Sequence, residues 1–499
     1  MKNSIYCFLF LALVSSNLSG QTQDQKLKDF DAYIQKSQAE WRAPGMAVAV
    51  VKDGKVIFKK GFGVRELGKE DKVDTETLFS CASTTKAMTA TCIGMLVDEG
   101  KLKWDDLVNT HLPEYQLYDP AVTRELRIRD LLTHNSGVGN TDFLWGAMDI
   151  STKEMLNRMR LVKPTYSFRA SFIYQNLFYV AAGQVIEKVS GKPWEVFIQE
   201  RIFTPLGMSR TAPKRKYIKD NNQVTPHFEV EKKIKPIGYT KDDEVGPAGS
   251  VWSSIDDMSK WMACMLDSSK YAGGRLVKAA TWAEMFKPAV IVPADQFYPT
   301  MQLIKPNWTT YGLGWFQHDY KGKKINYHTG SLDGLTAIHA QLPDQKLGIY
   351  VFGNFDHAEV RHALVYKAFD VFALGGTTDW SKDFLTLYTG IREKGEKELK
   401  DFEAKRVLNT TPSLPLADYA GKYADPLYGE VEITVSENSL KIDINHFVKA
   451  SLQHWHFNTF RGPYEHDWNG KALANFVLDV NGKIQKVNLE GMDFAKAKK

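Results

Sequence analysis

Strand-like patterns stand at both ends of the first 375 residues, and helical patterns fill the stretch between them. Residues 46–58, MAVAVVKDGKVIF, indicate two strands around an Asp-Gly turn, which is a strong hairpin signal. Strand patterns return at 311–328, and a second hairpin pattern follows at 335–354. Because strands at both ends must pair to bury their apolar faces, we predict one antiparallel sheet with an inserted helical subdomain, an α+β fold.

Three helices are predicted with definite limits inside this region. One runs from Ser83 to about Leu102, with Gly100 as its C-terminal stop. The others cover Asn176–Gly191 and His357–Leu374.

A change of pattern marks a second domain near the C-terminus. Residues 384–406 are rich in Glu and Lys and predict an exposed helix, which the two prolines of TPSLPL at 411–416 end. Alternating apolar residues then predict short strands between 431 and 480. We expect three units after the N-terminal segment: a large α+β domain at 21–375, a helical linker at 376–412, and a small all-β barrel or sandwich at 413–499.

The first twenty residues have the pattern of a cleaved secretory signal. Lys2 precedes the apolar run Ile5–Val14, and cleavage is expected between Gly20 and Gln21. Ten apolar residues are too few to cross a bilayer, so no stable membrane span is expected. These features predict a secreted or periplasmic protein.

Composition and charge narrow the class of protein. The net charge of +5 is spread over the whole chain without a basic block, which argues against nucleic-acid binding. Cys81, Cys92 and Cys264 remain after signal cleavage, an odd number without metal-like spacing. We therefore expect buried free thiols, no metal and no organic cofactor, and the sequence leaves the oligomeric state open.

Ser83 and Lys86, in the stretch FSCASTTKAMTA, are the first candidates for chemistry. Residues three apart on a helix lie on one face, so the amine can help to deprotonate the hydroxyl. The first helical turn also supplies an unpaired backbone amide. The alternative is an ordinary helix start, since serine and threonine are common caps.

Tyr174 and Asn176 precede the second predicted helix. A tyrosine hydroxyl beside an ammonium can have a lowered pKa and act as a general base, and an asparagine amide can orient a substrate carbonyl or the lysine. The alternative is a buried aromatic residue at 174 and a helix N-cap at 176.

His328, Gly330 and Ser331 end a predicted strand in the sequence His-Thr-Gly-Ser. Glycine allows a substrate to approach the backbone closely, and the next amide can complete an oxyanion hole. The alternative is a simple turn after the strand. His134 could suggest a Ser–His–Asp triad, but its segment indicates a helix end turning at Gly137, and we interpret it as structural.

The order of these three motifs resembles the serine β-lactamase and penicillin-binding-protein family, in particular its branch of class C β-lactamases, D-aminopeptidases and esterases. The resemblance covers residues 27–375, and the C-terminal region resembles a lipocalin-like domain. Four further segments are similar to the family: IRDLLTHNSGV at 128–138, FTPLGM at 203–208, GPAGSVWSSIDDMSKWM at 246–262 and YGLGW at 311–315.

The resemblance implies a role for each candidate residue. Ser83 would be the acylated nucleophile and Lys86 its proton partner. Tyr174 would act as base in acylation and as acid for the leaving group, and Asn176 would orient the substrate and Lys86. The amides of Ser83 and Ser331 would form the oxyanion hole.

The resemblance also implies that His328, Gly330 and Ser331 bind the substrate. His328 departs from the family, because many β-lactamases place a lysine there for the lactam carboxylate. We therefore expect a peptidase or esterase that acts on small amides, short peptides (including those with D-residues) or esters. Two alternatives are a β-lactamase and a penicillin-binding or ligand-binding protein with weak catalysis. The loops at 141–169 and 288–309 are expected to shape the substrate pocket.

Overall fold

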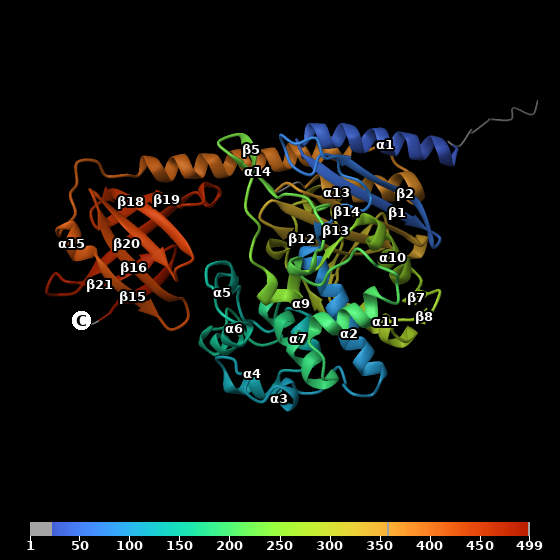
Figure 1. Ribbon diagram of the computed structural model, residues 1–499, viewed down its shortest axis with the longest axis horizontal. Coiled ribbons are helices and arrows are strands. Elements are labelled where there is room, and N and C mark those ends of the chain that lie inside the picture. The colour runs from blue at the N-terminus through green and yellow to red at the C-terminus, as the bar shows by residue number, and fades with distance from the viewer. Residues whose placement is uncertain (1–21, 357–358, 498–499) are drawn as a thin grey trace, which may run out of the picture.

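The computed structural model describes residues 22–356 and 359–497, so the predicted signal segment 1–20 lies outside the described residues. Figure 1 shows a large α+β body and a β-barrel beside it, connected by the long helix α14 (Trp380–Ala404). The expected limits at 375 and 412 stay predictions. In the described ranges, no helix is long and apolar enough to cross a membrane.

An eight-stranded antiparallel sheet forms the centre of the large body, in the order β2-β1-β14-β13-β12-β11-β10-β9. Strand β1 pairs with β14, with Val48 opposite Val351, which joins the N-terminal hairpin to the late strands. The predicted α+β sheet built from both ends is therefore confirmed. The strands are β1 (Gly45–Lys52), β2 (Lys55–Gly63), β9 (Val290–Ile291), β10 (Thr309–Tyr311), β11 (Phe316–Tyr320), β12 (Lys323–Leu332), β13 (Leu335–Leu342) and β14 (Leu347–Gly353).

Alternate side chains of the central strands enter two separate hydrophobic cores. Ala47 and Ala49 of β1 belong to one core, whereas Val48 and Val50 belong to the other. This division arises because successive side chains of a strand point to opposite faces of the sheet, and both faces are buried here. Each face is covered by helices: α2 (Thr85–Asp98), α7 (Asn176–Ser190) and α10 (Ile255–Leu266) on one, and α1 (Gln23–Glu40), α13 (Val360–Phe369) and the start of α14 on the other.

Helices α2 and α7 agree with the predicted limits to within a few residues. The helix predicted at 357–374 is observed as α13 followed by a π-helical turn at Asp370–Leu374, and its predicted start at 357 lies outside the described residues. Helix α7 begins at Asn176 and ends before Gly191, which has a φ of 73°. Helix α2 follows a 3-10 turn at Ala82–Thr84 and ends at Asp98, two residues before Gly100. The inserted subdomain contains further short helices: α3 (Val108–His111), α4 (Pro120–Glu125), α5 (Phe143–Gly146), α6 (Thr152–Arg158), α8 (Trp194–Ile198) and α9 (Gly246–Gly249).

The C-terminal domain is a closed barrel of eight strands in sequence order, so the predicted barrel-like domain is confirmed. Its interior is filled by aromatic and aliphatic side chains, including Tyr423, Leu452, Phe460 and Phe476. The strands are β15 (Gly421–Asp425), β16 (Gly429–Ser436), β17 (Ser439–Ile444), β18 (Val448–His456), β19 (Thr459–Pro463), β20 (Lys471–Leu478), β21 (Ile484–Leu489) and β22 (Met492–Lys496).

The loop between β15 and β16 contacts the inserted helices α5 and α6. The ring of Tyr428 packs edge-on against Phe143, with their centres 5.5 Å apart. Nη1 of Arg158 donates a 2.9 Å hydrogen bond to the carbonyl of Leu427. The barrel therefore supports the part of the subdomain that begins at α5 (Figure 1).

Candidate active site

Ser83 lies in the 3-10 turn that connects β3 (Phe79–Ser80) to α2. Strand β3 is fixed by pairing with β6 (Trp252–Ser253). Ala82, directly before the serine, has a φ of +43°, a left-handed conformation that is strained for a residue with a side chain. This turn leaves Ser83 partly exposed at the end of an otherwise buried helix.

Lys86 lies one turn further along and has no exposed surface. Its Nζ donates hydrogen bonds to Oγ of Ser83 at 2.9 Å, to Oδ1 of Asn176 at 2.7 Å and to the carbonyl of Ala248 at 2.8 Å. Burial lowers the pKa of Lys86 to about 7, although the nearby carboxylate of Asp142 opposes this effect. A substantial fraction of the amine is therefore neutral at pH 7 and able to accept the proton of Ser83.

Tyr174 also contacts Ser83. Burial raises the pKa of Tyr174 well above its ordinary value, and a hydrogen bond with Ser83 only partly offsets this. The Nζ of Lys86 lies 4.9 Å from the centre of the tyrosine ring. We expected the lysine to lower the pKa of the tyrosine. That expectation was wrong, because desolvation acts on both groups: it favours a neutral phenol and a neutral amine.

Asn176 links the lysine to a carboxylate that the sequence did not reveal. Its Nδ2 donates a 2.8 Å hydrogen bond to Oδ1 of Asp142, which also accepts one from Nε1 of Trp145 at 2.8 Å. The cap of α7 is Gln175, whose side chain accepts from the amide of Leu177, so the alternative of an N-cap at Asn176 is wrong. Asp142 lies in a loop without a motif, which left no signal for it.

His134 holds the segment that carries Tyr174. Its Nδ1 accepts a 3.1 Å hydrogen bond from the amide of Gln175, and its carbonyl accepts one from the amide of Ile173. Burial lowers the pKa of His134 well below its usual value. These contacts agree with the structural role that the sequence indicated.

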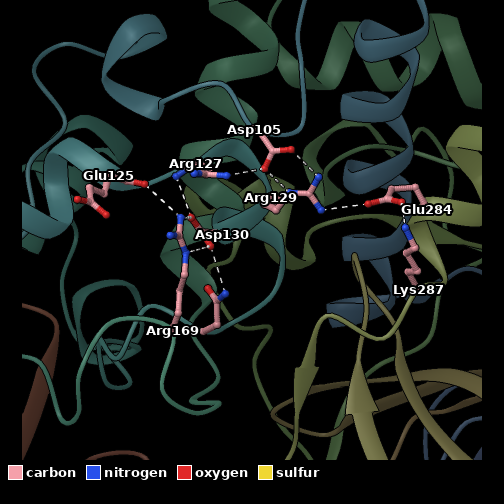
Figure 2. Close-up of polar contacts among 9 residues, drawn as sticks. Asp105, Glu125, Arg127, Arg129, Asp130, Arg169, Glu284 and Lys287 are labelled. Carbon is pink, nitrogen blue, oxygen red and sulfur yellow. Dashed lines mark hydrogen bonds and ion pairs between the residues drawn. The ribbon is translucent and has the colours of Figure 1, made fainter.

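A network of charged groups fixes the turn before His134 (Figure 2). Asp130 is 1% exposed and accepts hydrogen bonds from Nη2 of Arg169 at 2.6 Å and from Nε at 3.1 Å. Arg129 pairs with Asp105 and with Glu284. The network joins the 127–135 segment to the segment that leads into Tyr174, so it stabilises the position of that tyrosine.

Gly330 allows strand β12 to pass directly beside the turn that carries Ser83. A Cβ atom at this position would lie 2.2 Å from the carbonyl oxygen of Cys81 and 3.1 Å from the backbone nitrogen of Ser83. Ser331, the next residue, is exposed and lines the cavity in front of Ser83. The structure therefore brings the His-Thr-Gly-Ser segment to the Ser-x-x-Lys turn, as the motif order indicated.

The position of His328 differs from our expectation that its side chain meets the substrate. The residue is 1% exposed and does not line the cavity. Nδ1 lies 2.6 Å from the carbonyl of Thr329, and Nε2 lies 2.9 Å from Oη of Tyr311. A carbonyl oxygen can only accept a hydrogen bond, so Nδ1 carries the proton of the neutral imidazole. Nε2 therefore accepts a hydrogen bond from the hydroxyl of Tyr311. Burial lowers the pKa of His328 to about 3, and both nitrogens are occupied by the protein.

A cavity of about 520 Å³ opens in front of Ser83, Tyr174 and Asn176. Both predicted pocket loops contribute to it, through Trp145 from the first and Tyr298 from the second. This size suits a small molecule or a short peptide segment. Cys81, Cys92 and Cys264 are buried free thiols, and among the described residues no group of His, Cys, Asp and Glu side chains could hold a metal ion.

Comparisons with known proteins agree with this geometry. Residues 30–371 match the Beta-lactamase family model, and residues 405–498 match a domain of unknown function, DUF3471. The unguisins hydrolase ungD of Aspergillus violaceofuscus is 27% identical over 82% of this chain and 76% of its own length. Protein flp of Staphylococcus aureus strain MRSA252 is 24% identical over 68% of this chain and 64% of its own length.

A solved structure shows the same fold. The octameric penicillin-binding protein homologue from Pyrococcus abyssi superimposes with a TM-score of 0.60 at 22% identity, covering 94% of this chain and 98% of that chain. Together with the family match over most of the large body, this shows that the chain belongs to the β-lactamase family of serine hydrolases.

Proposed function

We propose that Ser83 forms an acyl-enzyme with small amides, short peptides (including those with D-residues) or esters, which water then hydrolyses. The observation that carries this proposal is the buried Lys86 amine, 2.9 Å from Oγ of Ser83 and with a pKa near 7. A serine hydroxyl is a weak nucleophile unless a nearby base takes its proton.

In acylation, the neutral amine of Lys86 accepts the proton of Ser83 as Oγ attacks the substrate carbonyl. In this proposal the backbone amides of Ser83 and Ser331 stabilise the resulting oxyanion. The proton then passes from the lysine through the Tyr174 hydroxyl to the leaving nitrogen or oxygen, and the bond to that atom breaks. In deacylation, water attacks the ester carbonyl and loses a proton to the same pair. The bond between the acyl carbon and Oγ of Ser83 then breaks, the carboxylic acid leaves, and the proton returns to Oγ.

The cavity favours this substrate class over an anionic β-lactam. Among the described residues that line it, none is a lysine or an arginine, and His328 offers no free nitrogen. A lactam carboxylate therefore lacks a cationic partner. An intact set of Ser83, Lys86 and Tyr174 also disfavours a protein that only binds its ligand.

Labelling with a fluorophosphonate tests the nucleophile. Intact mass and peptide mapping should place one adduct on Ser83, and Ser83→Ala should lose both the adduct and ester hydrolysis while keeping its circular dichroism spectrum. Ser190→Ala, at the end of α7 and outside the cavity lining, is the matched control and should be labelled normally. An adduct on another residue would exclude Ser83 as the nucleophile.

We further propose that the protein is exported to the periplasm or the medium after cleavage between Gly20 and Gln21. The basis is the short apolar run behind Lys2. N-terminal sequencing of the protein from an expressing cell tests this, and a retained Met1 would contradict it.

A further inference from the structure

The walls of the cavity carry an excess of acidic side chains. Among the described lining residues the ionisable side chains other than tyrosine are all carboxylic acids, namely Asp142, Asp242, Asp333, Asp356 and Glu359. The guanidinium of Arg361 lies 3.1 Å from Glu359 and compensates its charge. A cavity lined by one sign of charge attracts ligands of the opposite sign.

Asp242 is the member of this group that has a buried oxygen without a hydrogen-bond partner. It is 4% exposed, and its Oδ2 has no hydrogen-bond partner. The Oγ1 atom of Thr240, which also lines the cavity, is buried without a partner as well. Buried polar atoms are nearly always hydrogen-bonded, because each unsatisfied one costs about 1–3 kcal/mol. Both oxygens belong to residues that line this cavity and a smaller neighbouring one, and both lack a hydrogen-bond donor that an amine of a ligand can supply.

The neighbouring cations do not fill this position. Lys241 turns away from the cavity, with its Nζ 3.5 Å from Asp149 and 4.8 Å from the ring of Phe447 in the barrel. Lys214 pairs with Glu195, and the guanidinium of Arg215 stacks 3.4 Å from the ring of Tyr239. Burial, assisted by the adjacent Asp243, raises the pKa of Asp242 to about 7, as expected for a carboxylate without an ion-pair partner.

We propose that Asp242 and Thr240 form a subsite for the ammonium group of the substrate, whose acyl carbonyl lies at Ser83. The ammonium would donate hydrogen bonds to Oδ2 of Asp242 and Oγ1 of Thr240, and the carboxylate of Asp142 contributes negative charge to the same cavity. The substrates are then acyl donors with a free amine, such as amino-terminal amides and esters. This proposal rests on the proposed hydrolase function, but binding alone can test it.

The binding test uses the Ser83→Ala protein and two uncleaved probes. Alaninamide carries an ammonium group, and N-acetylalaninamide is its neutral counterpart. Calorimetry should show that one enantiomer of alaninamide binds at least ~10-fold more tightly than the N-acetylalaninamide of the same configuration. This is the scale of one charge-assisted hydrogen bond. Asp242→Asn in this background should remove that preference, whereas Asp243→Asn should keep it. Equal binding of the two probes, or a preference that survives Asp242→Asn, overturns the subsite.

The kinetic test compares alanine p-nitroanilide with its N-acetyl and N-succinyl derivatives, which are cationic, neutral and anionic. The ratio of kcat/KM for the cationic over the neutral substrate should fall at least ~10-fold in Asp242→Asn. It should also fall in Thr240→Val, a second variant of similar shape. Asp243→Asn should stay within about twofold of the native ratio. If the native protein turned over none of these substrates and fluorophosphonate did not label Ser83, the hydrolase function would be rejected. The calorimetry would then still decide whether the ammonium subsite exists.

Discussion

The Nζ atom of Lys86 lies 2.9 Å from Oγ of Ser83, although the lysine has no exposed surface. In the proposed mechanism the neutral amine of Lys86 is the active form, and its pKa is about 7. We therefore expect kcat/KM for a neutral ester to rise with pH through an apparent pKa near 7 and then level. A pH–rate profile measures this. Lys86→Met should abolish the activity, and a flat profile between pH 5 and 9 would contradict the assignment.

The same pKa affects stability. A free lysine titrates near 10.5, so the unfolded chain binds more protons than the folded chain between about pH 7 and pH 10.5. The contribution of Lys86 to the free energy of unfolding therefore increases with pH across that window and is least favourable below pH 7. Urea unfolding of Lys86→Met should show a smaller increase with pH than the native protein. Identical slopes would mean that the lysine is charged in the folded state.

Tyr174→Phe should lower kcat by about 10²–10⁴-fold, because the phenol relays the proton to the leaving group. The rising limb near pH 7 should remain, since it reports Lys86. Tyr179→Phe is a suitable control: its ring lies 5.4 Å from the same Nζ, but its hydroxyl donates to the carbonyl of Leu132. A normal rate for Tyr174→Phe would mean that Lys86 transfers the proton to the leaving group without the tyrosine.

Gly330→Ala should lower kcat strongly while the protein remains folded. The new methyl group would lie 2.2 Å from the carbonyl oxygen of Cys81, so β12 must move away from the nucleophile turn. Gly395→Ala, on the exposed part of α14 with no atom within 4 Å, should be harmless or slightly stabilising. Steady-state kinetics and melting curves of both variants test this, and normal catalysis by Gly330→Ala would show that the approach of β12 is unimportant.

His328→Lys should destabilise the protein instead of creating a site for anionic substrates. The side chain is buried and makes hydrogen bonds through both nitrogens, so a lysine would place a charge in an apolar layer at a cost of several kcal/mol. His328→Gln keeps a polar, uncharged side chain of similar size and should lower the stability of the protein less than His328→Lys. A stable lysine variant with selectively faster turnover of an anionic lactam would show that position 328 reaches the substrate.

Deleting residues after 412 should leave a folded large body, because the barrel has its own core. Helix α5 carries Trp145, which lines the cavity, and the truncation removes the contact that Phe143 of this helix makes with Tyr428. We therefore expect the KM of the truncated enzyme to rise several-fold. Tyr428→Ala should reproduce part of the effect, and Val480→Ala, fully exposed on the barrel, should not. An unchanged KM would separate the barrel from substrate binding, and molten protein would show that the two cores depend on each other.

Local patterns were sufficient for much of the fold. Hairpins such as 46–58 depend on neighbouring turn residues, and helix α7 is defined by its own apolar spacing and by Gly191. The motifs at Ser83, Tyr174 and Gly330 were visible for the same reason, because each is a short run of residues whose chemistry is readable alone. Their order then indicated that they meet at one site.

The sequence by itself therefore determined the elements, the sheet built from both ends and the three motifs. Only the tertiary structure decided the charge states and the surroundings. Burial lowers the pKa of Lys86 and raises that of Tyr174. The packing of the sheet buries His328, so its side chain does not line the cavity. Asp142 and Asp242 come from loops without a motif, and their roles arise only from what packs around them. Desolvation and long-range contacts depend on residues distant in the chain, so no local pattern encodes them.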